Sequence, residues 1–248
     1  MKQRVFRTVL AVAAFSACAF LSACVLFRDT TDSVFDEGED TIAKDRAASE
    51  IETAEFNYEF GGGRGTVTIR FEAPSHVRID VLDGDRSLVF CLNGASGWMF
   101  VRGEVIDMTA EDIQLMHAAL LQAMPFQVNF QDYFANAELQ EKTESVCGEE
   151  CNVIHAVFRR DQDVPVKLWF GADTDLLRQF EVTREDGVHT TQYFDYRSFD
   201  GVTLPVQMFK FSPDGATKVT LVSFEMNIDI PAYVFRKPEM LSALEGGR

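Results

Sequence analysis

Short segments in which apolar and polar residues alternate recur along most of this chain, and they constrain its fold more than any other feature. Val67, Ile69 and Phe71 are separated by polar residues, and the segment 77–81 repeats the pattern. An alternation of period two turns one face of a β-strand inward and leaves the other in water. Further segments of this kind span residues 138–146, 152–159, 164–170, 176–185, 188–197, 202–211 and 216–228.

Glycine, aspartate and asparagine separate these segments. Such residues stand at 83–84, 93–97, 185–187, 199–201 and 212–215, and they supply the backbone conformations that tight hairpins require. The glycine-rich stretch 61–65 lacks the Lys-Ser/Thr of a phosphate loop and is therefore interpreted as a turn. Tight turns join neighbouring strands in opposite directions, so we expect roughly ten to twelve strands in a meandering antiparallel sheet.

Two helices are expected beside the strands. The first spans about residues 41–53, and the second runs from Thr109 towards Met124. Thr109 and Asp112 form an approximate capping box at the start of the second helix. Ile113, Met116 and Leu120 share one of its faces, which either packs on the core or forms a lid over an apolar hollow. The expected fold class is α+β: a sheet that curls into an open barrel round a few helices.

Phenylalanine is unusually abundant, with 22 residues in the chain. These rings can simply fill a core. Two helices cannot easily cover the inner face of so many strands, however, so we expect part of that face to line a hydrophobic, ligand-binding cavity. The candidate lining residues are Phe71, Ile79, Phe90, Trp98, Phe100, Met116, Leu120, Leu168, Phe170, Phe180, Phe194 and Phe209.

The N-terminal segment predicts export and lipidation. Three basic residues precede an apolar run over residues 9–21, the layout of a secretory signal, and that run is too short to span a bilayer. Residues 21–24 resemble the lipobox of bacterial lipoprotein precursors, so Cys24 is expected to carry the lipid after cleavage. The alternatives are an ordinary signal peptide with a chance cysteine, or a lipobox ending at Cys18. The residue after Cys24 is Val25 rather than Asp, and in lipoprotein sorting this favours the outer membrane.

These signals divide the chain into four parts. We expect a signal peptide over residues 1–23, a lipidated cysteine with an acidic tether over 24–50, one folded domain over 51–238 and a tail over 239–248. The mature part has 20 basic and 39 acidic residues, a formal charge of −19, because the signal contains three basic residues and no acid. Such a surface repels nucleic acid and anionic headgroups, so membrane attachment is assigned to the lipid.

Three cysteines remain after Cys24. Cys147 and Cys151 are expected to flank a three-residue turn and to form a disulfide in an oxidising compartment. The alternative is two free thiols, with Cys91 buried as a small apolar residue. A zinc site is not expected, because the spacing offers no second pair of ligands.

The sequence offers little that points to an enzyme. It lacks the nucleophile elbow and the metalloprotease motif, and its four histidines are scattered. Acidic pairs such as Asp173 and Asp175 fall in turns, where aspartate is favoured for its backbone hydrogen bonds. No catalytic residue, metal or cofactor is therefore assigned.

The stretches 167–170, 193–205 and 235–238, with Gly97 and Trp98 after a polar turn, resemble the outer-membrane lipoprotein-sorting family, the LolA/LolB-like fold. The resemblance implies a half-barrel of about eleven strands, helices on its concave face and a cavity that shelters acyl chains. The expected protein is a membrane-anchored envelope lipoprotein, at the periplasmic face of the outer membrane, that binds a lipid or the acyl chain of a lipoprotein. The alternatives are an envelope sensor that binds a protein partner through the same fold, or a purely structural surface lipoprotein.

Overall fold

A single antiparallel sheet of 14 strands organises the described part of the chain. The computed structural model describes residues 51–110, 112–113, 116, 134–158 and 161–238. The strands are β1 (Thr53–Phe60), β2 (Gly65–Glu72), β3 (His76–Asp83), β4 (Arg86–Asn93), β5 (Ser96–Val101), β6 (Glu104–Asp107), β7 (Phe134–Leu139), β8 (Glu144–Val146), β9 (Glu149–Phe158), β10 (Asp161–Gly171), β11 (Leu177–Arg184), β12 (Gly187–Phe199), β13 (Val202–Ser212) and β14 (Gly215–Met226).

The strand order shows a meander with one long-range pairing. The path through the sheet is β6-β5-β4-β3-β2-β1-β14-β13-β12-β11-β10-β9-β7, and β8 pairs with β9 beside it. Pairing of β1 with β14 joins the first and last strands, so the ends of the path are β6 and β7. The sheet is therefore not closed.

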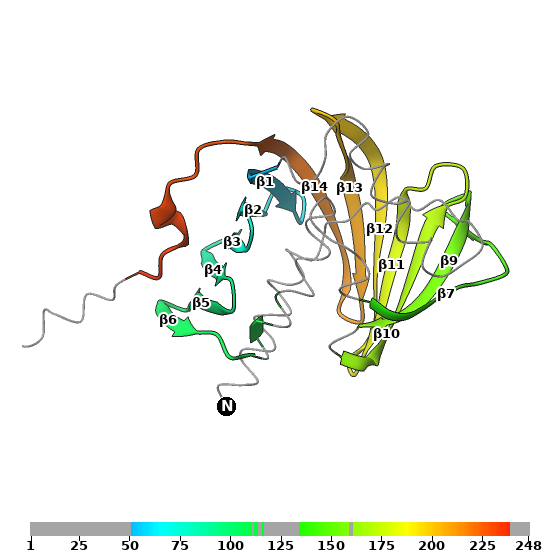
Figure 1. The fold of residues 1–248 in the computed structure, drawn as a ribbon, viewed down its shortest axis with the longest axis horizontal. Coiled ribbons are helices and arrows are strands. Elements are labelled where there is room, and N and C mark those ends of the chain that lie inside the picture. The colour runs from blue at the N-terminus through cyan, green and yellow to red at the C-terminus, as the bar shows by residue number, and fades with distance from the viewer. Residues whose placement is uncertain (1–50, 111, 114–115, 117–133, 159–160, 239–248) are drawn as a thin grey trace, which may run out of the picture.

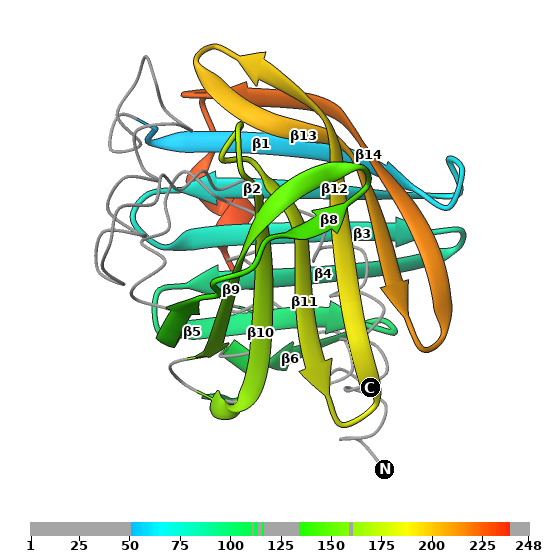
Figure 2. The same cartoon turned by 90° about the vertical axis from the view of Figure 1, so that its right-hand side faces the viewer.

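The sheet curls until its two halves face each other. Strands β1–β6 form one half and β7–β13 the other, with β14 at the junction (Figure 1). Seen from the side, the strands of one half cross those of the other (Figure 2). We call the surface enclosed between the halves the inner face and the opposite surface the outer face.

The predicted alternation explains which side chains point inward. In β2, Val67, Ile69 and Phe71 are buried, whereas Thr66 and Arg70 are exposed or half-buried on the other side. Residues that pair across neighbouring strands lie on the same face of the sheet, and the inward Ile69 pairs with the inward Ile79. Each strand thus contributes every second residue to the inner face.

Three expectations about the elements need correction. The strand count is 14 rather than about eleven. The segment expected as one strand over 138–146 is divided into β7 and β8, because the polar residues 140–143 between them leave the ladder. Thr53, expected at the end of the first helix, begins β1, where Ala54 is buried against Phe71 and Met226. Ile51 and Glu52, the other described residues of that expected helix, are not helical, and residues 41–50 lie outside the described residues.

The second helix begins where its cap was predicted. The amide of Thr109 donates to Asp112 Oδ2 at 2.8 Å, and the amide of Asp112 donates to Thr109 Oγ1 at 3.2 Å. This reciprocal pair is a capping box with aspartate in the third position. Residues 110, 112, 113 and 116 are helical, and the expected continuation to Met124 lies outside the described residues. A sheet wrapped round helices is thus not established.

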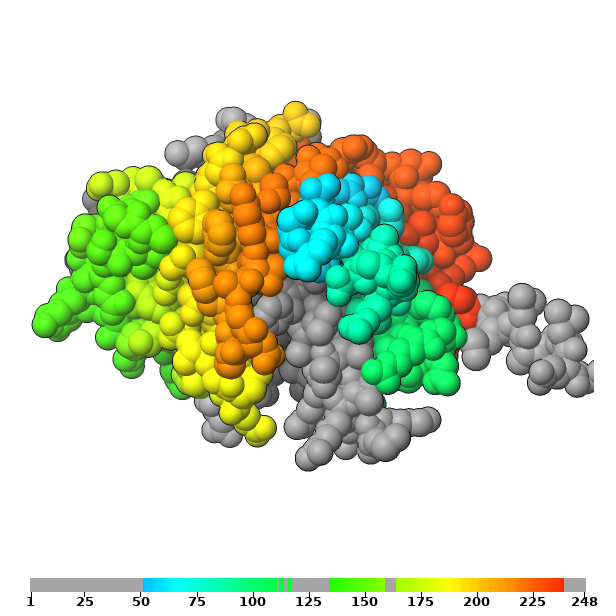
Figure 3. Space-filling model, turned by 180° about the vertical axis from the view of Figure 1, so that it is seen from behind, coloured from blue at the N-terminus to red at the C-terminus, as the bar shows by residue number. Residues whose placement is uncertain are grey.

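A C-terminal segment covers part of the outer face. It comprises residues 227–238 and contains the short 3-10 helix η3 (Ala232–Phe235), which lies against β3 and β4 (Figure 3). Ile230 and Phe235 pack there on Val89, Cys91 and Trp98. The carbonyl of Phe235 accepts hydrogen bonds from Trp98 Nε1, Asn93 Nδ2 and Cys91 Sγ. These contacts fasten the segment to the sheet.

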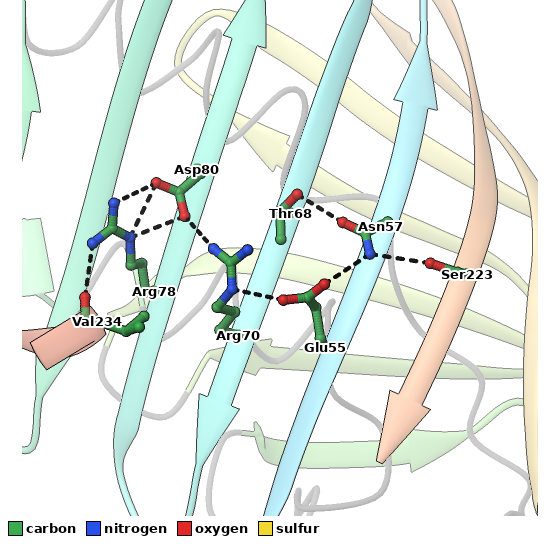
Figure 4. A network of polar contacts seen from close by, with 8 residues as sticks. All are labelled: Glu55, Asn57, Thr68, Arg70, Arg78, Asp80, Ser223 and Val234. Atoms are coloured by element: carbon green, nitrogen blue, oxygen red, sulfur yellow. Dashed lines mark hydrogen bonds and ion pairs between the residues drawn. The ribbon is translucent and has the colours of Figure 1, made fainter. Parts of the chain in front are cut away.

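A polar network crosses the outer face beside this segment (Figure 4). Arg70 bridges Glu55 Oε2 at 2.6 Å and Asp80 Oδ2 at 2.8 Å, and Arg78 pairs with Asp80 and donates to the carbonyl of Val234 at 2.7 Å. The charges alternate across β1, β2 and β3, so each carboxylate faces an arginine. The network continues from Glu55 through Asn57 to Thr68 and Ser223. It links the outer face of four strands to the C-terminal segment.

Replacing Phe235 with alanine is expected to lower the free energy of unfolding by about 3 kcal/mol, because a buried phenylalanine would leave a cavity against the sheet. Tyr233 lies in the same 3-10 helix but is 69% exposed, so its replacement by alanine should change stability by less than about 0.5 kcal/mol. Urea unfolding followed by tryptophan fluorescence would measure both. Equal effects would show that the segment does not depend on this contact.

Candidate functional site

The inner face is a largely apolar surface to which both halves of the sheet contribute. One cluster of buried side chains contains Ile69, Ile79 and Phe90 from β2–β4 and also Leu168, Phe180 and Tyr193 from β10–β12. Each of these is no more than 2% exposed. A long apolar surface enclosed between two layers is suited to an apolar ligand rather than to a charged substrate.

Seven of the twelve predicted lining residues belong to this cluster. They are Phe71, Ile79, Phe90, Met116, Leu168, Phe170 and Phe180. The structure thus brings together residues that are more than a hundred positions apart in the chain. Their contact with a ligand stays a prediction.

Four other predicted lining residues lie on the outer face, and for them the predicted place was wrong. Trp98 and Phe100 pack with the C-terminal segment. Phe194 and Phe209 form an edge-to-face pair with ring centroids 5.5 Å apart on β12 and β13. The twelfth residue, Leu120, lies outside the described residues.

Strand parity is the physical reason for this correction. Met99 points inward, so its neighbours Trp98 and Phe100 must point outward. Met208 is fully buried in the inner cluster, which places Phe209 on the opposite side. The sequence carries this signal, because Trp98 and Phe100 alternate with Met99, and Phe209 alternates with Met208.

The connection between the two edge strands also contributes to the inner face. It leaves β6 at Asp107 and enters β7 at Phe134. Met108 at its start, Met116 within it and Phe134 at its end are all buried in the inner cluster, with Ile113 packed against them. The helix stripe predicted from Ile113 and Met116 therefore packs on the core.

Polar residues on the inner face were missed by the sequence analysis. Lys210 is only 4% exposed and Thr191 only 7%, and both sit at inward positions of their strands. The two are register partners across β12 and β13. Strand alternation could have revealed Lys210, because it follows the inward residues Leu204, Val206 and Met208 at steps of two.

Two histidines outside the core form local pairs with carboxylates. His189 Nε2 lies 2.9 Å from Asp186 Oδ1, and this hydrogen bond lowers the pKa of Asp186. His76 lies 3.3 Å from Glu72. Within the residues that the structure describes, no group of three or more histidine, cysteine, aspartate or glutamate side chains could hold a metal ion. These pairs resemble surface ion pairs rather than an acid–base site.

The cysteines differ from the expected arrangement. The turn between β8 and β9 consists of only Cys147 and Gly148, with φ of 53° and 84°, because Val146 pairs directly with Glu149. Cys151 pairs with Glu144 and is buried beside Val153 and Trp169, whereas Cys147 is exposed at the tip. Both thiols are free in this structure, so the three-residue turn and its disulfide are not formed there.

Alkylation should distinguish these thiols. Burial raises the pKa of Cys91 to about 12 and that of Cys151 to about 11, so at pH 8 their thiolate fractions are on the order of 10⁻⁴ and 10⁻³. Burial also raises the pKa of Cys147, but its side chain is exposed. Iodoacetamide followed by peptide mass spectrometry should modify Cys147 at least about tenfold faster than the other two. A peptide containing a Cys147–Cys151 disulfide would contradict the structure.

Comparison with solved structures identifies the fold. The chain aligns with a LolA superfamily protein from Nitrosomonas europaea at a TM-score of 0.57 and 14% identity, covering 85% of this chain and 99% of that chain. It aligns with a DUF1329 family protein from Desulfovibrio piger at a TM-score of 0.54 and 13% identity, covering 82% and 97%. No protein-family model matches the sequence, and no curated protein sequence matches it. The shared feature is therefore the fold, as the resemblance in the last third of the sequence implied.

Proposed function

From this LolA-like fold, we propose that the protein is a non-enzymatic, membrane-anchored envelope lipoprotein that binds a lipid or acyl chain against the inner face of its sheet. The observation that carries the proposal is the apolar inner face, which strands of both halves build together. Among the described residues, the only members of the inner cluster that lie outside the strands are Ile51, Met108, Ile113, Met116 and Leu176. All other members of the cluster lie on strands, so an acyl chain on the inner face would contact mainly apolar residues of the sheet.

The energetics of such binding are favourable without a charged contact. Transfer of a chain of about sixteen carbons from water to an apolar wall releases roughly 12 kcal/mol at ~0.8 kcal/mol per methylene. Ordering of the ligand and of the protein opposes this gain. Even a partial match between chain and wall therefore supports binding.

Attachment to the membrane is assigned to lipid on Cys24, with residues 24–50 as the tether. Both lie outside the described residues. No helix in the described part of the chain is long and apolar enough to span a bilayer. A formal charge of −19 on the mature chain opposes electrostatic binding to anionic headgroups, so the proposal depends on the acyl anchor. Val25 after the lipidated cysteine favours the outer membrane as the destination.

The direct test is extraction of non-covalent lipid from the purified full-length protein. Organic solvent removes a bound ligand but leaves lipid that is covalently attached to Cys24, so the two can be separated before mass spectrometry. We expect acyl lipid in about equimolar amount to the protein, above the level in an unrelated lipoprotein purified in the same detergent. A protein that is empty and does not take up added lipid would refute the proposal.

A second candidate function is binding of a protein partner, and the outer face supports it. Phe211 is 42% exposed on β13, where it follows Phe209 of the Phe194–Phe209 pair at a step of two, and Val188 on β12 and Val222 on β14 are 47% and 59% exposed. Neighbouring exposed apolar side chains are typical of interaction surfaces. An empty inner face together with specific capture of one envelope protein, lost on Phe211→Ser, would favour this function over the first.

A further inference from the structure

Three neighbouring polar residues interrupt the apolar inner face at one end of the second half of the sheet. They are Thr191, Lys210 and Thr217, and we call them the polar step. The register aligns Leu168 with Phe180, Phe180 with Thr191, Thr191 with Lys210 and Lys210 with Thr217. The first two residues of this row are apolar, and the last three are polar. In the described part of the inner face, the buried cation of Lys210 is therefore flanked by the hydroxyl groups of Thr191 and Thr217.

The residues beyond this step are apolar again. Tyr193, Met208 and Val219 form the next inward row, and each is no more than 1% exposed. Along β13, Met208, Val206, Leu204 and Val202 follow Lys210 at steps of two, over about 27 Å at ~3.4 Å per residue. In the other direction, the hairpin between β13 and β14 ends at Ser212 and Gly215, two residues from Lys210. The polar step thus lies near one rim of a long apolar track.

A buried lysine strongly favours a nearby anion. Removal of an ammonium group from water is costly unless the charge is compensated, and attraction to an anion is stronger in an apolar surrounding than in water. Lys210 has an interaction within the protein, so a ligand anion would join or replace that contact. The hydroxyl of Thr191 in the same row could donate a hydrogen bond to the same anion.

We infer that Lys210 and Thr191 receive the anionic group of the ligand, a carboxylate or a phosphate, while its acyl chain extends along the inward residues of β13. This inference rests on the proposed lipid-binding function and adds a preference for anionic over neutral lipids of the same chain. Charge at one rim followed by an apolar track matches the head and tail of such a ligand.

The test compares matched anionic and neutral ligands on the full-length protein by native mass spectrometry. Oleate competes with oleyl alcohol in one arm, and dioleoylphosphatidylglycerol competes with dioleoylglycerol in the other. We expect the anionic member to be preferred about tenfold in at least one arm, since a hydrogen bond to a charged group contributes about that factor. Preference in the first arm identifies a carboxylate, and preference in the second identifies a phosphate.

Variants assign the preference to Lys210. Lys210→Met should abolish it, so that the anionic and neutral ligands of each arm bind about equally, and Lys210→Arg should retain it. Lys218→Met is the matched control, because Lys218 is exposed on the outer face of the adjacent strand, over the ring of Phe209. This variant should bind like the wild type.

The outcomes separate the two proposals. Equal binding of anionic and neutral ligands by the wild type overturns the inference and leaves lipid binding intact, as does a preference that persists in Lys210→Met. A wild type that binds none of the four ligands refutes lipid binding itself. Should Lys210→Met fail to fold, loss of the anionic preference in Lys210→Arg would count against the inference.

Discussion

Replacement of Cys24 by alanine should move the protein out of the membrane fraction, either as a soluble form or as an uncleaved precursor. The residues 21–24 that resemble a lipobox would lose the thiol to which the diacylglycerol is attached. Stable attachment requires more than one acyl chain, and a mature charge of −19 supplies no electrostatic substitute. We expect at least a tenfold fall in membrane-bound protein, measured by fractionation, together with loss of labelling by radioactive palmitate.

Cys18 supplies the matched control for this experiment. It also follows two small residues in the signal segment, but cleavage before it would leave a shorter apolar run. Cys18→Ala should therefore fractionate and label like the wild type. If Cys24→Ala remained labelled and membrane-bound while Cys18→Ala did not, Cys18 would be the lipidated residue. The signal peptide would then end before Cys18, and the tether would begin there.

Much of the sheet could be predicted from local pattern. The alternation at Val67, Ile69 and Phe71 determines which side of β2 is buried, because a strand has no other way to segregate these residues. Asp200 and Gly201 adopt φ of 48° and 89°, the conformation that the hairpin signal between β12 and β13 required. The capping box at Thr109 was likewise a local signal.

The errors concern relations between distant parts of the chain. Pairing of β1 with β14 joins residues about 170 positions apart, so no local signal showed that Thr53 would begin a strand rather than end a helix. The covering of Trp98 by Phe235 also depends on tertiary contact. The turn of two residues at Cys147 and Gly148 had no such local signal, because its first position holds cysteine rather than the asparagine, aspartate or glycine that favours positive φ.

The apolar residues of the candidate site were largely predicted from the sequence, but its buried polar residues were not. Composition indicated an apolar inner face, and seven of the twelve expected residues lie in it. The buried Lys210 was not anticipated, because a lysine in a strand is usually assigned to the exposed side. Parity along β13 decides its direction, and only the register shows that Thr191 and Thr217 lie beside it.

Phe90 and Phe209 offer the strongest test of the assignment of faces, since the sequence alone placed both in the cavity. Phe90 is 1% exposed and pairs with Ile79 and Met99 in the inner cluster. Phe209 is half-buried on the outer face, next to Phe194 and under Lys218. Phe90→Ala should lower the free energy of unfolding by about 3–5 kcal/mol, because the two layers prevent collapse of the cavity it leaves.

Phe209→Ala should cost only about 1 kcal/mol, since solvent already reaches this ring and its loss leaves no enclosed cavity. Urea unfolding of the two variants, with unchanged dependence on denaturant, would measure the difference of about 2–4 kcal/mol. A domain of this size has a total stability of only about 5–15 kcal/mol, so the inner-face variant approaches the limit of folding, whereas the outer-face variant does not. Equal decreases in the free energy of unfolding would mean that the two faces are equally enclosed. The assignment of the ligand to the inner face would then lose its support.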